Sequence, residues 1–319
     1  MPPRTICVTG AAGFIGSHIA EALLAAGHRV LVLDNLSSGR RENVPAGAEL
    51  HELDIRSAEA AELVREGGGE VLVHHAAQMD VRRSVADPCF DADVNVRGTL
   101  NLLEAGRKGK VRQVVFASTG GAIYGEQDTF PADESHAARP ISPYGVAKLA
   151  VERYLYFYHV QYGLDATCLR YANVYGPRQN AHGEAGVVAI FLDRLLSGRE
   201  CVIYGDGLQT RDYVFVGDVV RANAAAVGHS HKGFAILNVG TGVETDVVTL
   251  YRRLAAACGI ERPARHEEAK PGEQRRSCIS AALLERELGV RVTTALDEGL
   301  GRTAEWFRSR PLGQSSPRV

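Results

Sequence analysis

The sequence lacks three features that mark whole classes of protein: a long apolar run, an excess of one charge, and a signal-peptide pattern in its first residues. Hydrophobic residues make up 45% of 319 positions, yet no apolar run approaches the ~20 residues that span a membrane. Lysine plus arginine (36) nearly balance aspartate plus glutamate (38), so nothing points to nucleic acid. The amino-terminal residues show no signal-peptide pattern. We therefore expect a cytoplasmic protein without a membrane or nucleic-acid partner.

Cysteines are few, and their spacing fits neither a zinc site nor a redox motif. The six stand at positions 7, 89, 168, 201, 258 and 278, and no two form a Cys-x-x-Cys pair. Several fall within apolar stretches, which predicts buried free thiols. Such thiols are typical of a reducing compartment, and we expect no metal site.

What the sequence does contain is an alternation of short apolar strands with helices. The patterns predict strands at 5–9, 29–33, 50–53, 71–74, 113–117 and 166–170, and helices at 14–26, 57–66, 91–105 and 143–162. This alternation predicts an α/β fold, a doubly wound parallel Rossmann sheet.

The pattern loosens after residue 175. Helices are expected at 187–196, 216–226, 249–257 and 281–288, and strands at 201–204 and 235–239. We predict a nucleotide-binding domain over 1–175, to which segments near 213–240 return. A smaller mixed C-terminal substrate-binding region would cover 176–310, and residues 311–319, rich in proline, serine and glycine, would form a flexible tail.

A glycine loop joins the first strand to the first helix. Gly10, Gly13 and Gly16 allow backbone N–H groups to approach a pyrophosphate at the helix N-terminus. Asp34 ends the second strand, where a carboxylate hydrogen-bonds ribose hydroxyls and repels a 2′-phosphate. The pair favours NAD over NADP. Arg40 and Arg41 follow closely and could accept a phosphate, and Asp34 could also be a simple turn residue.

A second segment, Ser142 to Lys148, carries acid–base chemistry. Ser142 is a good N-cap and Pro143 suits the first helical position. Tyr144 and Lys148 then lie four residues apart on one helix face. A phenol ionises near pH ~10, but a neighbouring ammonium and the positive helix end favour the phenolate. Tyr144 is therefore a candidate general base, although an exposed pair is the ordinary reading of Tyr-x-x-x-Lys on a generic helix.

These motifs together resemble the extended short-chain dehydrogenase/reductase family. The resemblance rests on Asn95, on Tyr144-x-x-x-Lys148, and on segments 9–17, 34–36, 54–55, 75–77, 173–178 and 205–213. It covers about residues 4 to 308 and is strongest for the branch of bacterial UDP-glucose 4-epimerases. The resemblance implies a tightly held NAD that is reduced and reoxidised in each turnover. Tyr144 would remove the C4 hydroxyl proton of a nucleotide sugar, and Lys148 would hold the nicotinamide ribose and lower the pKa of Tyr144.

By the same resemblance, a larger set of residues would contact the cofactor. Met79 falls where some epimerases have lysine, so one pyrophosphate contact is in doubt. His74 and His75, at a strand end, could be mistaken for catalytic bases. The implied cofactor contacts are Gly10, Gly13, Phe14, Ile15, Gly16, Asp34, Asn35, Ser37, Ser38, Gly39, Asp54, Ile55, His75, Ala76, Ala77, Asn95, Tyr144 and Lys148.

In the family, a catalytic Ser or Thr usually stands a fixed number of residues before a Tyr-Gly pair. Here the segment from Thr119 to Tyr124-Gly125 is one residue longer than the commonest spacing. An ungapped match gives Gly120; a gapped match gives Thr119, with Ser118 second, and we favour Thr119. Both hydroxyls could instead cap the strand end. Dehydratases and decarboxylases of the family follow this residue with an acidic one, whereas Gly120 and Gly121 follow here. The absent acid favours C4 epimerisation over a 4,6-dehydratase or decarboxylase.

For the substrate, a UDP-hexose, the resemblance implies Thr119, Tyr144, Asn173, Arg211 and Lys270. Guanidinium binds phosphate in a bidentate manner, although Arg211 could also form a surface ion pair. Lys270 stands where arginine is common in the family. Residues 187–188 are Val-Val, where other epimerases have a polar contact. Because of these two differences, the resemblance does not identify the sugar. The alternative to an enzyme is a regulator that binds NAD and catalyses no reaction. Relatives often pair through helices like 91–105 and 144–162, so a homodimer is possible.

Overall fold

A seven-stranded parallel sheet forms the centre of the protein. The structure is a computed structural model that describes residues 2–67, 69–181, 186–229, 233–269 and 274–310. The strands lie in the order β10-β6-β5-β4-β1-β2-β3, and every neighbouring pair is parallel. They are β1 (Thr5–Thr9), β2 (Arg29–Asp34), β3 (Glu49–Glu52), β4 (Val71–His74), β5 (Gln113–Thr119), β6 (Asp165–Tyr171) and β10 (Phe234–Val239). The predicted doubly wound Rossmann sheet is confirmed.

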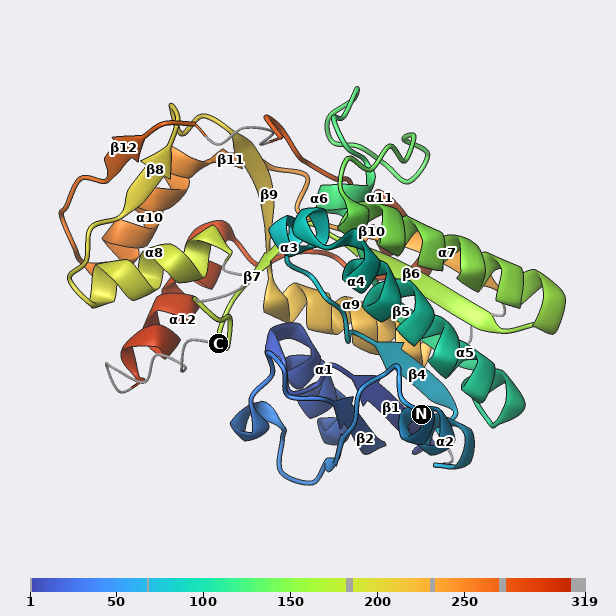
Figure 1. The fold of residues 1–319 in the computed structure, drawn as a ribbon. Coiled ribbons are helices and arrows are strands. Elements are labelled where there is room, and N and C mark those ends of the chain that lie inside the picture. The colour runs from blue at the N-terminus through green and yellow to red at the C-terminus, as the bar shows by residue number, and fades with distance from the viewer. Residues whose placement is uncertain (1, 68, 182–185, 230–232, 270–273, 311–319) are drawn as a thin grey trace.

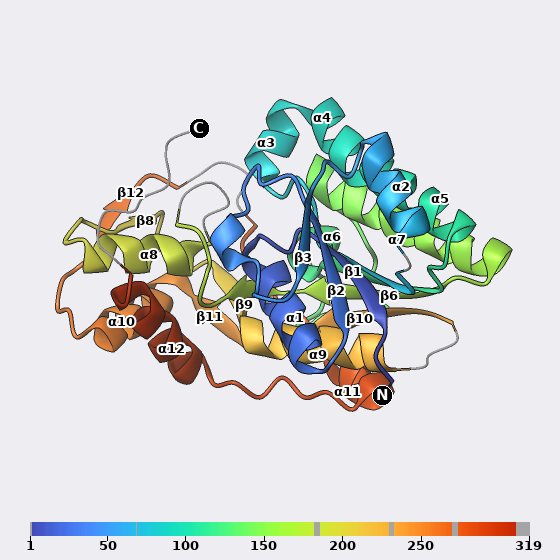
Figure 2. The same ribbon diagram turned by 90° about the horizontal axis from the view of Figure 1, so that it is seen from below.

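Helices cover both faces of this sheet, and each face has its own apolar core (Figure 2). One layer contains α1 (Phe14–Ala25), α9 (Val216–Gly228) and α11 (Ala282–Leu288). The other contains α2 (Ala58–Glu66), α3 (Val81–Ala86), α4 (Pro88–Ala92), α5 (Thr99–Lys108) and α7 (Pro143–Tyr162). Strand order reverses between β1 and β4, which is where such sheets bind dinucleotides at the carboxyl ends of the strands.

A smaller lobe lies beside the sheet, on the left of Figure 1. Its helices are α8 (Val187–Leu196), α10 (Val247–Cys258) and α12 (Leu296–Arg308), which share a third core with strand residues. A mixed three-stranded sheet, β11-β9-β7, and a parallel pair, β12-β8, complete it. Their bounds are β7 (Asn173–Tyr175), β8 (Val202–Tyr204), β9 (Thr210–Phe215), β11 (Glu244–Asp246) and β12 (Arg265–Glu267).

The structure differs from the sequence-based elements in two ways. The helix expected at 91–105 is three segments: α4, a π-helical stretch η2 (Asp93–Gly98), and α5. In addition, α3, α12 and the short strands β7, β9, β11 and β12 carried no prediction, and neither did the short helices η1 (Arg41–Asn43) and α6 (Gly120–Ile123). The predicted tail at 311–319 lies outside the described residues.

Candidate active site

The glycine loop after β1 has no room for side chains at two positions. Gly10 has φ +70°, and a Cβ there would lie 2.7 Å from the backbone nitrogen of Ala76. A Cβ on Gly16 would lie 2.4 Å from the carbonyl oxygen of Gly10. Gly13 is the N-cap of α1, which begins with Phe14 and Ile15. The loop therefore brings backbone N–H groups and a helix N-terminus to the switch point, the arrangement that binds a pyrophosphate.

Asp34 lies at the end of β2, and its carboxylate binds the backbone of the glycine loop and of the turn that follows β2. Its carboxylate accepts hydrogen bonds from the backbone nitrogens of Ala12 (2.9 Å) and Leu36 (2.8 Å). Burial raises the pKa of Asp34, and these two donors oppose the shift. A Cβ on Gly39 would lie 3.1 Å from Oδ1, so the 37–39 turn also closes on this carboxylate. Asp34 thus shapes the predicted ribose site as well as lining it.

A second carboxylate borders the same edge. Asp54 receives two hydrogen bonds from the Arg56 guanidinium, at 2.9 Å and 2.7 Å, and one from Asn35. The Arg56 donors hold the pKa of Asp54 well below its usual range. Ile55 is buried and packs against Gly98 of the π-helical segment. Asn35 and Asp54 are therefore joined at the carboxyl end of β2, beside Asp34, and Ile55 packs next to them; their contact with the cofactor stays a prediction.

A buried histidine joins the glycine-loop strand to the helix layer. Nδ1 of His74 lies 2.7 Å from the hydroxyl of Thr9, and Nε2 lies 2.9 Å from the hydroxyl of Thr99. Thr9 also accepts hydrogen bonds from the backbone nitrogens of His75 and Ala76. Its hydroxyl must therefore donate to His74, so His74 is neutral, and burial lowers its pKa to about 3. This excludes His74 as a base and makes it a structural bridge.

The segment after β4 is held by an amide cluster. Asn95 accepts from the backbone nitrogen of Gln78 and donates to the Gln78 carbonyl, at 2.9 Å and 2.8 Å. Asn95 is 3% exposed, and its two bonds fix the backbone of Gln78, the residue that follows 75–77. Nε2 of His75 lies 3.0 Å from the Tyr171 hydroxyl. Neither Thr9 nor Gln78 was predicted as a site residue, although Thr9 begins segment 9–17 and Gln78 directly follows segment 75–77.

Helix α7 presents Tyr144 and Lys148 to the ends of β4 and β5. Ser142 caps the helix by accepting from the backbone nitrogen of Gly145 at 3.2 Å. Lys148 is 4% exposed, and its Nζ donates to the carbonyl of Ala117 at 2.9 Å and lies 5.8 Å from the ring centre of Tyr144. Burial lowers the pKa of Lys148 to about 8. The lysine therefore remains largely cationic at neutral pH beside the phenol.

The two candidate hydroxyls at the end of β5 face different surroundings. Ser118 is 3% exposed and donates to Glu152 at 2.6 Å. Glu152 in turn forms a bidentate ion pair with Arg170, at 2.9 Å and 2.6 Å. Thr119 is only half-buried. Its neighbourhood includes Gly121, whose Cβ would lie 3.9 Å from the Thr119 hydroxyl oxygen and 3.7 Å from Oδ1 of Asn173.

The predicted substrate residues lie on the smaller-lobe side of this edge. Asn173 begins β7 and is exposed, and Arg211 lies on β9, two strands that pair with each other. Val188 is 1% exposed within the smaller-lobe core, so it is a packing residue. Lys270 lies outside the described residues. The structure thus brings Thr119 and Asn173 together across Gly121.

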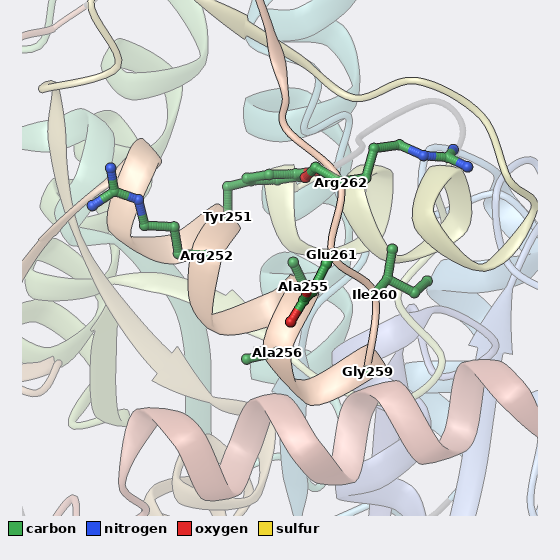
Figure 3. A pocket seen from close by; sticks show the side chains of 8 residues that line it. All are labelled: Tyr251, Arg252, Ala255, Ala256, Gly259, Ile260, Glu261 and Arg262. Carbon is green, nitrogen blue, oxygen red and sulfur yellow. The ribbon is translucent and has the colours of Figure 1, made fainter.

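A shallow surface hollow in the smaller lobe is separate from all of these residues (Figure 3). It surrounds the end of α10 and the turn that follows. Arg252 and Arg262 point away from each other at its two ends. It is lined by Tyr251, Arg252, Ala255, Ala256, Gly259, Ile260, Glu261 and Arg262, none of which was predicted to act.

Comparisons with known proteins agree with this geometry. The chain is 47% identical to the UDP-glucose 4-epimerase of Mycolicibacterium smegmatis over 96% of its length and 99% of that protein. The crystal structure of UDP-glucose 4-epimerase from Thermotoga maritima with UDP-glucose matches with a TM-score of 0.92 at 45% identity, covering 95% of this chain and 98% of that one. The UDP-glucose 4-epimerase of Thermus thermophilus in complex with NAD matches with a TM-score of 0.89 at 45% identity, covering 96% and 99%.

The sequence profile of a single family spans most of the chain. It matches residues 6–240, which begin in β1 and end just after β10. That range contains the glycine loop, Asp34, the β5 hydroxyls and the Tyr144–Lys148 helix. No described helix is both long and apolar enough to cross a membrane. By its matched profile and its relatives, the chain belongs to the NAD dependent epimerase/dehydratase family.

Proposed function

We propose that this protein is an NAD-dependent epimerase that inverts C4 of a nucleotide sugar, with UDP-glucose and UDP-galactose as the preferred pair. The observation that supports the proposal is the buried Lys148, which lies beside the Tyr144 ring and donates to the carbonyl of Ala117, two residues before Thr119, in a fold whose glycine loop has the shape that binds a pyrophosphate. The substrate pair is taken from the epimerase relatives and from UDP-glucose in the Thermotoga maritima structure.

The residues present fit NAD. The loop at Gly10 and Gly16 is a cradle that a Cβ would fill, and Asp34 stands at the ribose position. Lys148 supplies a cation with donors to spare beyond the Ala117 carbonyl, suited to ribose hydroxyls. When bound, NAD supplies a hydride acceptor that can return the hydride.

Tyr144 would accept the proton of the C4 hydroxyl and later return it. The Lys148 ammonium favours the phenolate of Tyr144, which makes proton transfer possible near neutral pH. Thr119 would orient the same hydroxyl. Asn173 and Arg211 would hold the sugar and the diphosphate from the smaller lobe, and Lys270 would assist them.

Two glycines favour epimerisation over dehydration. Gly120 carries no acid, and a Cβ there would lie 2.6 Å from Cδ1 of Ile279, so a larger residue would require Ile279 to move. Gly121 faces the space between Thr119 and Asn173 but brings no proton donor to it. Since elimination of water needs a further acid beside the reacting carbon, this chain lacks the group at the place where the dehydratases of the family carry it.

Product mass tests the reaction directly. The purified protein is incubated with UDP-glucose, UDP-N-acetylglucosamine, UDP-glucuronate and dTDP-glucose, and products are analysed by mass spectrometry and chromatography. We expect an isomer of unchanged mass, formed fastest from UDP-glucose without consumption of added NAD. Loss of a water mass or release of carbon dioxide would replace epimerisation by dehydration or decarboxylation, and no turnover at all would favour the regulator.

We also propose that the protein is a homodimer in the cytoplasm. Helix α7 lies on the outside of the sheet domain (Figure 1). It carries a stripe of exposed apolar side chains that includes Val146, Phe157 and Val160. A second copy of the helix would cover this stripe. All six cysteines are free, which suits a reducing compartment.

A further inference from the structure

Lys148 carries a charge in a place that disfavours charge. Its side chain is 4% exposed, and its Nζ lies 2.9 Å from the Ala117 carbonyl and 4.7 Å from the ring centre of Phe116. A carbonyl and a ring face only partly replace the water that an ammonium loses on burial. Some nearby anion must therefore support the cation if it is to act on Tyr144.

Four titratable groups besides Tyr144 act on Lys148 from the elements around it. His74 and His75 come from the end of β4, Glu152 from α7 itself, and Asp91 from α4. Burial lowers the pKa of both histidines to about 3, so they are neutral at physiological pH. The charge of Glu152 is already matched by its bidentate ion pair with Arg170.

Asp91 differs from Glu152 because no cation pairs with it among the described residues. It is 1% exposed, and its Oδ1 accepts from Nε2 of Gln78 at 2.9 Å and from Nδ2 of Asn95 at 3.0 Å. Its Oδ2 is buried and has no hydrogen-bonding partner in the described structure. A buried carboxylate oxygen left unpaired needs a compensating charge, and α4 packs directly against α7.

We propose that Asp91 is a positioning residue whose carboxylate is the counter-charge that keeps the buried Lys148 protonated. The amides of Gln78 and Asn95 hold this carboxylate in place, and the same Asn95 fixes the segment after β4. Asp91 acts on the proton transfer through Lys148 and touches neither substrate nor cofactor. The inference builds on the proposed function but predicts a property of the lysine that exists without turnover.

The test uses the scarcity of lysine in this chain. The sequence contains five lysines, so NMR of lysine-labelled protein resolves few side-chain signals, and Lys148→Met assigns the one of interest. In wild-type protein freed of NAD, the Lys148 signal should titrate near pH 8. In Asp91→Asn, which keeps the shape and removes the charge, the midpoint should fall by about one pH unit or more.

Asp93→Asn is the matched control, because it removes a neighbouring carboxylate whose partners are Arg56 and Arg97. Its Lys148 midpoint should stay within a few tenths of a unit of wild type. Asp91→Ser gives a second charge-free variant should Asp91→Asn fold poorly. The high-pH limb of turnover should move down with the midpoint in the charge-free variants.

An unchanged midpoint in the two Asp91 variants would overturn the proposal, and so would an equal fall in Asp93→Asn. A wild-type midpoint well below pH 7 would also overturn it, since no counter-charge would then be at work. Because the titration is read without substrate, a shifted midpoint in a protein that epimerises nothing would uphold Asp91 while refuting the proposed reaction.

Discussion

Ser118 and Thr119 are adjacent hydroxyls, and their surroundings predict opposite mutant phenotypes. Ser118→Ala removes the 2.6 Å hydrogen bond to the buried Glu152 carboxylate. We expect it to cost about 1–3 kcal/mol of unfolding free energy and to leave turnover of the folded enzyme within a few-fold. Thr119→Ala should lower turnover about tenfold or more with little loss of stability. Urea unfolding and steady-state kinetics on both variants measure the contrast.

Thr119→Ser supplies the control, since it keeps the hydroxyl and should restore most of the turnover. A large kinetic defect in Ser118→Ala with Thr119→Ala near wild type would reverse the assignment of the catalytic hydroxyl.

Tyr144 is the residue on which the proposed chemistry depends most. Tyr144→Phe removes the proton acceptor and keeps the ring beside Lys148, so turnover should fall by a factor of about 10²–10⁴ while substrate affinity changes little. Tyr156→Phe, an exposed position on the same helix, is the matched control and should behave as wild type. More than half the activity in Tyr144→Phe would contradict the mechanism.

Asp34 should discriminate between the two nicotinamide cofactors. Asp34→Asn removes the charge that repels a 2′-phosphate, and it also disturbs the backbone contacts to Ala12 and Leu36. Calorimetry should therefore show weaker NAD binding and a preference over NADP reduced by about tenfold, equivalent to about 1.4 kcal/mol. The exposed Glu62→Gln, on α2, is the control and should leave the preference intact. Equal or tighter NADP binding by the wild type would contradict the assignment.

At the scale of elements, the bridge from β1 through His74 to α5 predicts sensitivity to acid. The pKa of His74 is lowered by burial to about 3, against 6.5 in the unfolded chain. Below pH ~6.5 the unfolded state therefore binds a proton that the folded state refuses, and stability falls by about 1.4 kcal/mol per pH unit from this residue until about pH 3. Urea unfolding at pH 7 and pH 5 should show that His74→Asn loses less stability on acidification than wild type.

The exposed His266→Asn is the control for this acid effect. It should lose as much stability between pH 7 and pH 5 as wild type. Equal acid sensitivity of wild type and His74→Asn would exclude the bridge as its origin.

Elements with strong local signals were predictable, and those made by tertiary contact were not. The glycine loop and the Ser142–Pro143 helix start carry their own conformational preferences, and the central strands are continuous apolar runs. In contrast, β11 and β12 read Glu-Thr-Asp and Arg-His-Glu, and only pairing with β9 and β8 makes them strands. The apolar spacing within α12 was a signal that could have been used. A π-helical segment inside an otherwise helical pattern leaves no mark on apolar periodicity.

The sequence predicts a site residue where the residue belongs to a known motif. It does not predict a role that depends on a partner distant in the sequence. The choice between Thr119 and Ser118 depends on Glu152, a residue 34 positions away from Ser118 in sequence. Likewise, the use of Asn95 to hold Gln78 follows from the packing of η2 beside the loop after β4. Contacts to the cofactor and substrate remain predictions from the family resemblance.

At the scale of the whole molecule, the apolar stripe of α7 predicts the oligomeric state. Val160 is 57% exposed on this stripe, so Val160→Lys should place a charge in the interface and shift sedimentation from dimer to monomer. Leu208→Lys, similarly exposed at 54% in the smaller lobe, is the control and should stay dimeric. A monomeric wild type would contradict the homodimer.

The last strand of the main sheet has a consequence for how the protein is made. Strand β10 pairs with β6 along its whole length. In the sequence, however, β6 ends at Tyr171 and β10 begins at Phe234, and much of the smaller lobe lies between them. On the ribosome, β6 therefore waits as an unpaired sheet edge while that intervening chain is synthesised. A nascent chain in which β6 has left the ribosome and β10 has not would present this open edge, which makes it a candidate for chaperone binding at that stage.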